Sequence, residues 1–203
     1  MSRIWTYYRG AWHEGDVRVL GANSHATWLG SLVFDGARAF EGITPDLDLH
    51  AARVNQSARN LGLEPTLTPE AIMALTHEGL RKFGDKPAVY IRPMYWAEEG
   101  DVSVVSPDPA STDFALCLEE MPLVEPKGFT ITTTRFRRPT VETMPTNAKA
   151  ACLYPNNARM IREARAKGFQ NALVQDFAGN VAELATANVF FVKDGHYFTP
   201  VAN

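Results

Sequence analysis

The sequence predicts a mixed α/β fold in two domains, and three observations support this. The chain has 203 residues, enough for one large domain or two small ones at roughly 150 residues per domain. Both strand-like and helix-like segments occur along it, before and after residues 121–128. The segment MPLVEPKG, with two prolines and a glycine, has the composition of a linker. We therefore predict domains at 1–120 and 129–203, with 121–128 as the linker between them.

Composition and charge narrow the function classes. Hydrophobic residues make up 45% of the chain and charged residues 21%, as in an ordinary globular protein. The net charge of −3 gives no reason to expect nucleic acid or an anionic membrane as a partner. No apolar run is long enough to span a bilayer, and the N-terminus lacks a signal-peptide core. Cys117 and Cys152 are far apart and fit a reducing compartment, so we expect a cytoplasmic protein.

The chain opens with a predicted β-hairpin. Residues 4–8 are aromatic and β-branched, Arg9-Gly10 offers a turn, and residues 11–12 resume the strand pattern. The next predicted strand, 31–40, contains Gly36, which would let another group come close to the backbone.

Two helices are predicted next. Residues 49–61 follow helical spacing. The second helix is better marked, because Thr68 is a natural N-cap, Pro69 suits the first helical position and Gly84 ends the run. Its predicted buried stripe consists of Ile72, Leu75 and Leu80.

Two strands, 88–96 and 114–121, complete the first predicted domain, with a proline-containing loop at 105–111 between them.

The second predicted domain starts with a Thr-rich strand at 129–136 and a helix at 148–167. Pro155 should lie in the first turn, because deeper in a helix it would remove a hydrogen bond. The remaining predicted strands are 172–176, 189–193 and 196–199, the last two joined by a turn at Asp194-Gly195. Because the last strand has no partner after it, we expect the chain to be a fragment of a longer one.

Common catalytic motifs are missing from the sequence. The five histidines are scattered, with no HxxxH or CxxC pair, so no metal site is expected. There is no GxGxxG or GxxxxGK[ST] phosphate loop and no GxSxG elbow. Lys149 is more informative, because it lies among alanines in PTNAKAACLY, at a strand-to-helix junction. Desolvation there would make its amine nucleophilic, but the flanking residues alone favour an ordinary surface lysine.

Three segments in a fixed order favour a functional role for Lys149 over a surface lysine: LHAARVNQSA, NAKAACLY and GNVAELATANVFFV. Together they resemble the fingerprint of the class IV (fold-type IV) pyridoxal-phosphate aminotransferases. Two more segments, NSHATWLGSLVFDGARAFEG and VYIRP, are similar to the branched-chain amino-acid aminotransferases of that family. The resemblance covers nearly the whole chain. It implies that family's two-domain α+β fold, similar to D-amino-acid aminotransferase, with an incomplete C-terminal domain here, in a homodimer.

The resemblance also implies a cofactor site. Lys149 matches the catalytic lysine that binds pyridoxal phosphate covalently, and Tyr154 matches the tyrosine that hydrogen-bonds the phenolic oxygen. Glu183 matches the acid that pairs with the pyridine nitrogen, and Arg53 matches the arginine that binds the phosphate. A carboxylate beside the ring nitrogen keeps that nitrogen protonated, and a protonated ring accepts the electrons left by the substrate's α-proton.

Four further positions match the substrate side of the family's pocket. Arg38, Tyr90 and Arg92 match residues where the branched-chain enzymes receive the α-carboxylate, and Phe34 matches an aromatic wall. The family usually carries glutamate where this chain has Asp35.

The function implied is a transaminase that moves an amino group between a branched-chain-like L-amino acid and a 2-oxo acid such as 2-oxoglutarate. Alternatives on the same fold are an amine or D-amino-acid transaminase, or an aminodeoxychorismate lyase. An alternative from another class is a non-catalytic, truncated fragment, which the end of the chain at Asn203 supports.

Overall fold

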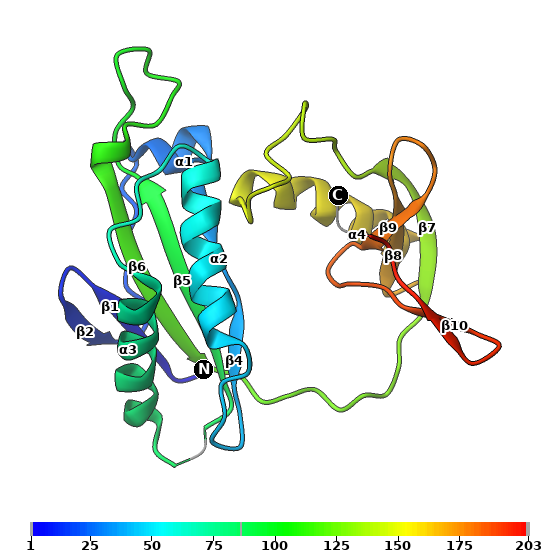
Figure 1. The fold of residues 1–203 in the computed structure, drawn as a ribbon, viewed down its shortest axis with the longest axis horizontal. Helices are drawn as coiled ribbons and strands as arrows, with labels where there is room; N and C mark the ends of the chain where they lie inside the picture. Colours follow the sequence, from blue (N-terminus) through cyan, green and yellow to red (C-terminus); the bar gives the residue numbers. More distant parts are fainter. Residues whose placement is uncertain (1, 86, 202–203) are drawn as a thin grey trace. The chain divides into compact units, whose positions relative to one another are not determined.

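A computed structural model describes residues 2–85 and 87–201 (Figure 1). The chain forms two compact units. The first unit comprises Met1–Val124 and Asn147–Cys152, and the second comprises Glu125–Thr146 and Leu153–Asn203. Both units combine helices and strands, as predicted. No helix among the described residues is long and apolar enough to cross a membrane.

An antiparallel sheet of six strands is the core of the first unit, within the residues described. The strand order is β2-β1-β6-β5-β3, and β4 also pairs with β5. The strands are β1 Ile4–Tyr8, β2 Ala11–Glu14, β3 Leu32–Phe34, β4 Ala37–Ala39, β5 Val89–Ala97 and β6 Thr112–Glu120. The predicted hairpin is confirmed, and the two predicted strands 88–96 and 114–121 are confirmed to within two residues.

Helices cover one face of this sheet. Helix α2 (Leu47–Asn60) packs on β3, β4 and β5, and α3 (Pro69–Leu80) packs on β5 and β6 (Figure 1). The strand residues under them are buried, among them Val33, Ala37 and Ile91. The short elements of the unit are α1 His25–Leu29, η1 Arg81–Phe83 and η2 Pro109–Ser111. The short helix η3 Ala151–Leu153 begins in this unit, and its last residue belongs to the second.

The predicted strand at 31–40 is wrong as a single element, because it breaks into β3 and β4. Asp35, at the break, donates its N–H to the carbonyl of Pro93 at 3.0 Å. Pro93 has no N–H to donate in return, so the ladder is interrupted there. Asp35 therefore lies between β3 and β4, outside both strands, and is fully buried.

The predicted start of α3 is confirmed, but the helix ends at Leu80, and Gly84 follows the short helix η1 instead. The Thr68 hydroxyl accepts a hydrogen bond from Ala71 N at 3.2 Å, and Pro69 begins the helix. The predicted stripe is only partly right, because Ile72 is buried but Leu75 and Leu80 are only half-buried. The helix turns Gly79 toward the sheet instead, where a Cβ would overlap Trp12 and Leu118. Close backbone approach at this glycine sets the rotation of the helix.

In the second unit, β7 (Ile131–Arg137) runs parallel to β8 (Asn171–Gln175), which pairs antiparallel with β9 (Val181–Leu184). Helix α4 (Tyr154–Ala166) packs on β7 and β8. The hydrophobic core of this unit contains Met160, Ala164, Ala172, Val174 and Ala185. A separate hairpin, β10 Phe191–Lys193 with β11 His196–Phe198, turns at Asp194-Gly195 as predicted. Strand β9 was not predicted.

The predicted helix at 148–167 starts too early. Helix α4 begins at Tyr154 with Pro155 in its first turn, and Ala150 instead forms an isolated bridge with Val33. This bridge draws residues 147–152 into the first unit, so the predicted range 129–203 differs from the second unit there. Lys149 consequently belongs with the sheet of the first unit.

Candidate active site

The four predicted substrate residues lie on one face of the first unit's sheet. Arg38 pairs with Tyr90 across β4 and β5, and Phe34 pairs with Met94 across β3 and β5. Cross-strand neighbours in an antiparallel sheet point to the same side, and so do alternate residues of one strand. Phe34, Arg38, Tyr90 and Arg92 therefore share the face opposite α2 and α3, and all four are half-buried.

Tyr90 lies between two guanidinium groups. The Cζ atoms of Arg38 and Arg92 are 5.3 Å and 5.1 Å from its ring centroid. A Cβ on Gly36 would overlap the Tyr90 hydroxyl, so the close approach predicted at this glycine is present. Arg92 also faces Glu119, with 3.5 Å between Nη2 and Oε2. The result is a cationic, aromatic surface on one side of the sheet.

Arg38 is oriented by the segment that follows β6. Its Nη1 donates to the carbonyl of Met121 at 2.9 Å, and its Nη2 lies 3.3 Å from the Met121 sulfur. The guanidinium therefore stays in one orientation beside Tyr90. Met121 was not expected to act on a site residue, since no local pattern links it to a strand 83 residues earlier.

Lys149 is held to the same sheet through its backbone. Its N–H donates to the Ser57 hydroxyl oxygen at 3.0 Å, and its carbonyl accepts from Phe34 N at 3.1 Å. Its ammonium Nζ is 5.1 Å from the centroid of the Phe34 ring. The structure thus brings the predicted catalytic lysine together with the predicted aromatic wall.

Arg53 contacts a buried carboxylate, that of Asp35, which is not among the predicted site residues. Its Nε donates to Asp35 Oδ2 at 2.6 Å and its Nη2 donates to Oδ1 at 2.8 Å. Asp35 is fully buried and also receives the Gly36 N–H at 2.7 Å and His50 Nδ1 at 2.8 Å. Burial would raise the pKa of the Asp35 carboxyl, but the hydrogen bonds from Arg53 and His50 hold that pKa below its usual value. The sequence did contain a signal for this contact, because Asp35 is a charged residue at an inward-facing position of the predicted strand 31–40.

The second unit carries the other two predicted cofactor residues. Tyr154 is the first residue of α4 and is exposed, and Glu183 lies on β9 opposite Val174. Asn157, in the first turn of α4, donates to the carbonyl of Ala185 at 2.8 Å, which ties the helix start to the end of β9. Tyr154 and Glu183 therefore lie on adjoining elements of one unit.

Glu183 has an arginine partner that was not predicted. Arg138 Nη1 donates to Glu183 Oε1 at 2.7 Å, and both side chains are about 30% exposed. Arg138 follows directly after β7, whereas Glu183 lies on β9. Nothing in the local sequence pairs these two residues.

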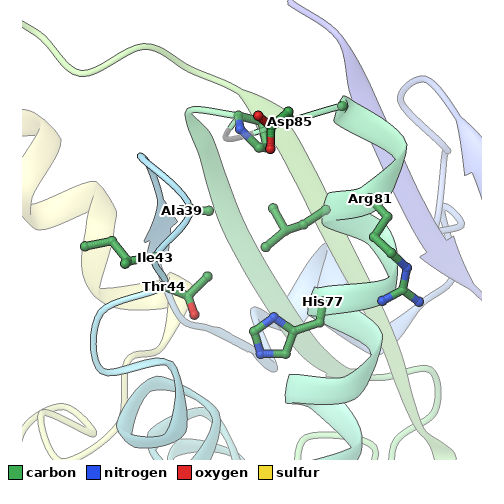
Figure 2. A pocket seen from close by; sticks show the side chains of 10 residues that line it. Ala39, Ile43, Thr44, His77, Arg81 and Asp85 are labelled. Atoms are coloured by element: carbon green, nitrogen blue, oxygen red, sulfur yellow. The ribbon is translucent and has the colours of Figure 1, made fainter.

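A cavity of about 300 Å³ also opens on the first unit (Figure 2). His77 projects from α3 and Arg81 from the start of η1 on one side, and Ile43 and Thr44 face them from the loop after β4. The cavity contains none of the predicted site residues. It adds no residue to the candidate site.

The comparison with known families decides the assignment. The family model described as amino-transferase class IV matches residues 32–203. The chain belongs to the class IV aminotransferases. The predicted family and the prediction of an enzyme are confirmed, and pyridoxal phosphate is the cofactor of this family, as predicted.

Relatives and solved structures agree with this assignment. The chain is 34% identical over 213 residues to a probable branched-chain-amino-acid aminotransferase of Rickettsia typhi, covering all of this chain and 72% of that protein. It is 28% identical over 200 residues to the branched-chain-amino-acid aminotransferase of Escherichia coli K12, covering 93% of this chain and 63% of that protein. It therefore spans less than two thirds of the E. coli enzyme.

The structural matches confirm the predicted fold class. An aminotransferase from Brucella abortus, bound to the cofactor PLP, matches with a TM-score of 0.98 at 72% identity. That match covers 99% of this chain and 72% of the Brucella chain. The branched-chain aminotransferase of Thermoproteus uzoniensis with norvaline matches with a TM-score of 0.85 at 26% identity, covering 98% and 68%.

Proposed function

We propose that this protein is a pyridoxal-phosphate-dependent transaminase that moves an amino group between a branched-chain-like L-amino acid and a 2-oxo acid such as 2-oxoglutarate. One observation carries the proposal. The Lys149 ammonium lies beside Phe34 on the sheet that also presents Arg38, Tyr90 and Arg92 on the Phe34 side. An amine and two guanidinium groups near one aromatic surface suit an anionic substrate that reacts at a carbonyl or amino carbon.

The donor set of the first unit fits the cofactor. Pyridoxal phosphate presents a phosphate dianion and an aldehyde, so it needs a cation and a primary amine. Arg53 supplies a guanidinium fork and Lys149 supplies the amine. The backbone of Lys149 bonds to Ser57, one turn after Arg53 on α2, so both groups are anchored to one helix. We assign the phosphate to Arg53 and the covalent bond to Lys149.

The second unit supplies the two other cofactor contacts in this proposal. Glu183 would hold a proton on the ring nitrogen, and Arg138 orients its carboxylate through the 2.7 Å hydrogen bond. The Tyr154 hydroxyl would donate a hydrogen bond to the cofactor's phenolic oxygen. When bound, pyridoxal phosphate takes up the electrons released as the substrate's α-proton leaves. Lys149, as a free amine, would accept that proton and return it.

Substrate choice rests on the cationic face. Arg38 and Arg92 flank Tyr90, which favours substrates with a carboxylate over simple amines. Arg38→Leu should therefore lower turnover of L-leucine with 2-oxoglutarate more than turnover of a carboxylate-free amine. Replacing Arg9, an exposed arginine of the same unit, by leucine is the control. Equal losses of turnover with L-leucine and with the amine would show that Arg38 does not recognise the carboxylate. That result would favour the amine transaminase alternative.

Identifying the lysine that binds pyridoxal phosphate covalently tests the proposal directly. The protein is incubated with pyridoxal phosphate, reduced with borohydride and digested, and the labelled lysine is identified by mass spectrometry. We expect the label on Lys149, its loss in Lys149→Ala, and no change in Lys167→Ala, which removes a lysine of the second unit that pairs with Glu163. A label that persists at another lysine in Lys149→Ala, or no label in the wild type, would overturn the proposal.

We also propose the homodimer and the cytoplasmic location that the family resemblance implies. Light scattering of the purified protein tests the dimer, and a monomer with full transaminase activity would contradict it.

A further inference from the structure

We propose that Asp35 and His50 are positioning residues that hold the Arg53 guanidinium in the orientation in which it binds phosphate. The inference rests on the proposed function, because the phosphate role of Arg53 belongs to it. It adds two residues that act on the cofactor through Arg53 rather than by touching it.

The Asp35–Arg53 contact fixes a plane, not only a distance. Two N–H groups of Arg53, on Nε and Nη2, meet the two different oxygens of Asp35 at 2.6 Å and 2.8 Å. Such a two-point contact sets both the plane and the rotation of the guanidinium. Because the fork is rigid, its remaining N–H donors point away from Asp35. The Asp35 carboxylate therefore sets the plane in which Arg53 presents those donors.

The two partners differ sharply in burial. Asp35 is fully buried at the break between β3 and β4, where its backbone bonds to Pro93 and its carboxylate also receives the Gly36 N–H. The Arg53 side chain is 55% exposed. A long side chain with that exposure samples many rotamers unless something fixes its end. The buried carboxylate of Asp35 fixes the guanidinium on the side that faces the protein.

His50 strengthens the same arrangement. Its Nδ1 is 2.8 Å from Asp35 Oδ1, and a carboxylate only accepts hydrogen bonds, so Nδ1 carries the proton and donates it. The 3.2 Å approach of Arg53 Nη2 to this nitrogen then brings two donors together and is not a hydrogen bond. Both groups are directed at the same oxygen. His50 thus keeps Oδ1 in place, one turn before Arg53 on α2.

Charge and orientation predict opposite results for one substitution. Asp35→Asn removes a negative charge beside Arg53, which would strengthen phosphate binding if net charge were the important factor. The same change replaces an oxygen acceptor by an amide N–H donor facing the guanidinium, which turns Arg53 out of its plane and would weaken phosphate binding. The sign of the effect therefore separates the two explanations.

The experiment compares two ligands that differ only in the phosphate. Dissociation constants for pyridoxal phosphate and for pyridoxal are measured by absorbance titration of cofactor-free protein. For Asp35→Asn we expect about tenfold weaker binding of pyridoxal phosphate, with pyridoxal unchanged within about twofold. Asp35→Glu keeps a carboxylate and should retain most of the affinity. Asp113→Asn is the matched control. This carboxylate belongs to the same unit, but it accepts a hydrogen bond from Tyr8, at 3.0 Å, and not from Arg53.

Each outcome decides a separate claim. Tighter binding of pyridoxal phosphate by Asp35→Asn, or equal weakening of both ligands, would overturn the positioning role. Should Asp35→Asn fail to fold, the pair His50→Leu and His50→Asn decides, since the asparagine amide can replace Nδ1 as the donor and leucine cannot. We expect weaker pyridoxal phosphate binding only in His50→Leu, and equal affinities in the pair would overturn the role. A wild type that binds neither ligand would instead overturn the proposed function.

Discussion

The backbone N–H of Lys149 donates a hydrogen bond to the side-chain oxygen of Ser57, 92 residues earlier in the chain, at 3.0 Å. Ser57 is buried on α2 with only 2% of its surface exposed. Further along the same helix, Asn60 donates to the carbonyl of Asn147 at 2.7 Å. Helix α2 therefore carries Arg53 and also holds the segment that carries Lys149, so one element sets the position of both cations.

Ser57→Ala should destabilise the first unit, because it removes a buried acceptor from the Lys149 N–H. The expected loss is about 1–3 kcal/mol, as for other buried polar groups that lose their partner. Urea unfolding followed by tryptophan fluorescence measures it, since all four tryptophans lie in the first unit. Thr27→Ala removes an exposed hydroxyl that donates to Gly21 and should change stability by less than about 0.5 kcal/mol. Equal losses in the two variants would contradict the role given to Ser57.

Gly36→Ala should displace Tyr90 from its place between Arg38 and Arg92. An added Cβ would overlap the Tyr90 hydroxyl and crowd its ring carbons. Overpacking of this kind costs roughly 1–3 kcal/mol. In a Tyr90→Ala background the clash is absent, so the same substitution should cost much less. A double-mutant cycle by urea unfolding measures the difference, and additive effects would show that the two residues do not contact one another.

The parts of the fold that the sequence predicted depend on neighbouring residues. The hairpin turn at Arg9-Gly10 and the cap at Thr68 depend on only a few adjacent residues, so both can be recognised from the sequence alone. The break in the strand at 31–40 was missed because its cause, Pro93, lies on the partner strand. The bridge between Val33 and Ala150 was missed for the same reason, and it decides to which unit Lys149 belongs.

The candidate site divides in the same way. The family resemblance named the residues that would touch cofactor or substrate, such as Lys149 and Arg53. It did not reveal the residues that hold them, because Asp35 and Ser57 act through contacts that exist only once α2 packs on the sheet. Arg138 belongs to this second group, since it meets Glu183 only through the pairing of β7, β8 and β9.

Arg138→Gln should lower turnover more than it lowers cofactor affinity. Under the proposed function, Glu183 acts on the ring nitrogen, and its orientation depends on the 2.7 Å hydrogen bond from Arg138. We expect about tenfold slower turnover, with the dissociation constant of pyridoxal phosphate changed by less than about threefold. Arg162→Gln, on the exposed side of α4, is the control. Full turnover in Arg138→Gln would show that Glu183 needs no help from this arginine.

Acid should loosen the second unit through Glu163. The hydrogen bonds from Lys167 and Thr134, at 2.9 Å and 2.6 Å, lower the pKa of the Glu163 carboxyl from 4.5 to about 2. A carboxyl whose pKa is lowered by folding stabilises the native state above its unfolded pKa. That stability is lost as the pH falls from about 4.5 toward 2. Glu163 joins α4 to β7, so the loss should appear as weaker attachment of this helix.

Hydrogen exchange followed by mass spectrometry can detect this loss, whereas tryptophan fluorescence cannot, because the second unit contains no tryptophan. Peptides from β7 and α4 should lose protection between pH 5 and pH 3 in the wild type, after correction for the intrinsic exchange rate. In Glu163→Gln the protection should be lower at pH 5 and should change less over the same interval, because glutamine does not titrate. Glu78→Gln, an exposed carboxylate of α3 in the first unit, should behave as the wild type. If Glu163→Gln kept the full acid dependence, other carboxylates of the second unit would have to carry it, and the Lys167 and Thr134 contacts would not control the acid response.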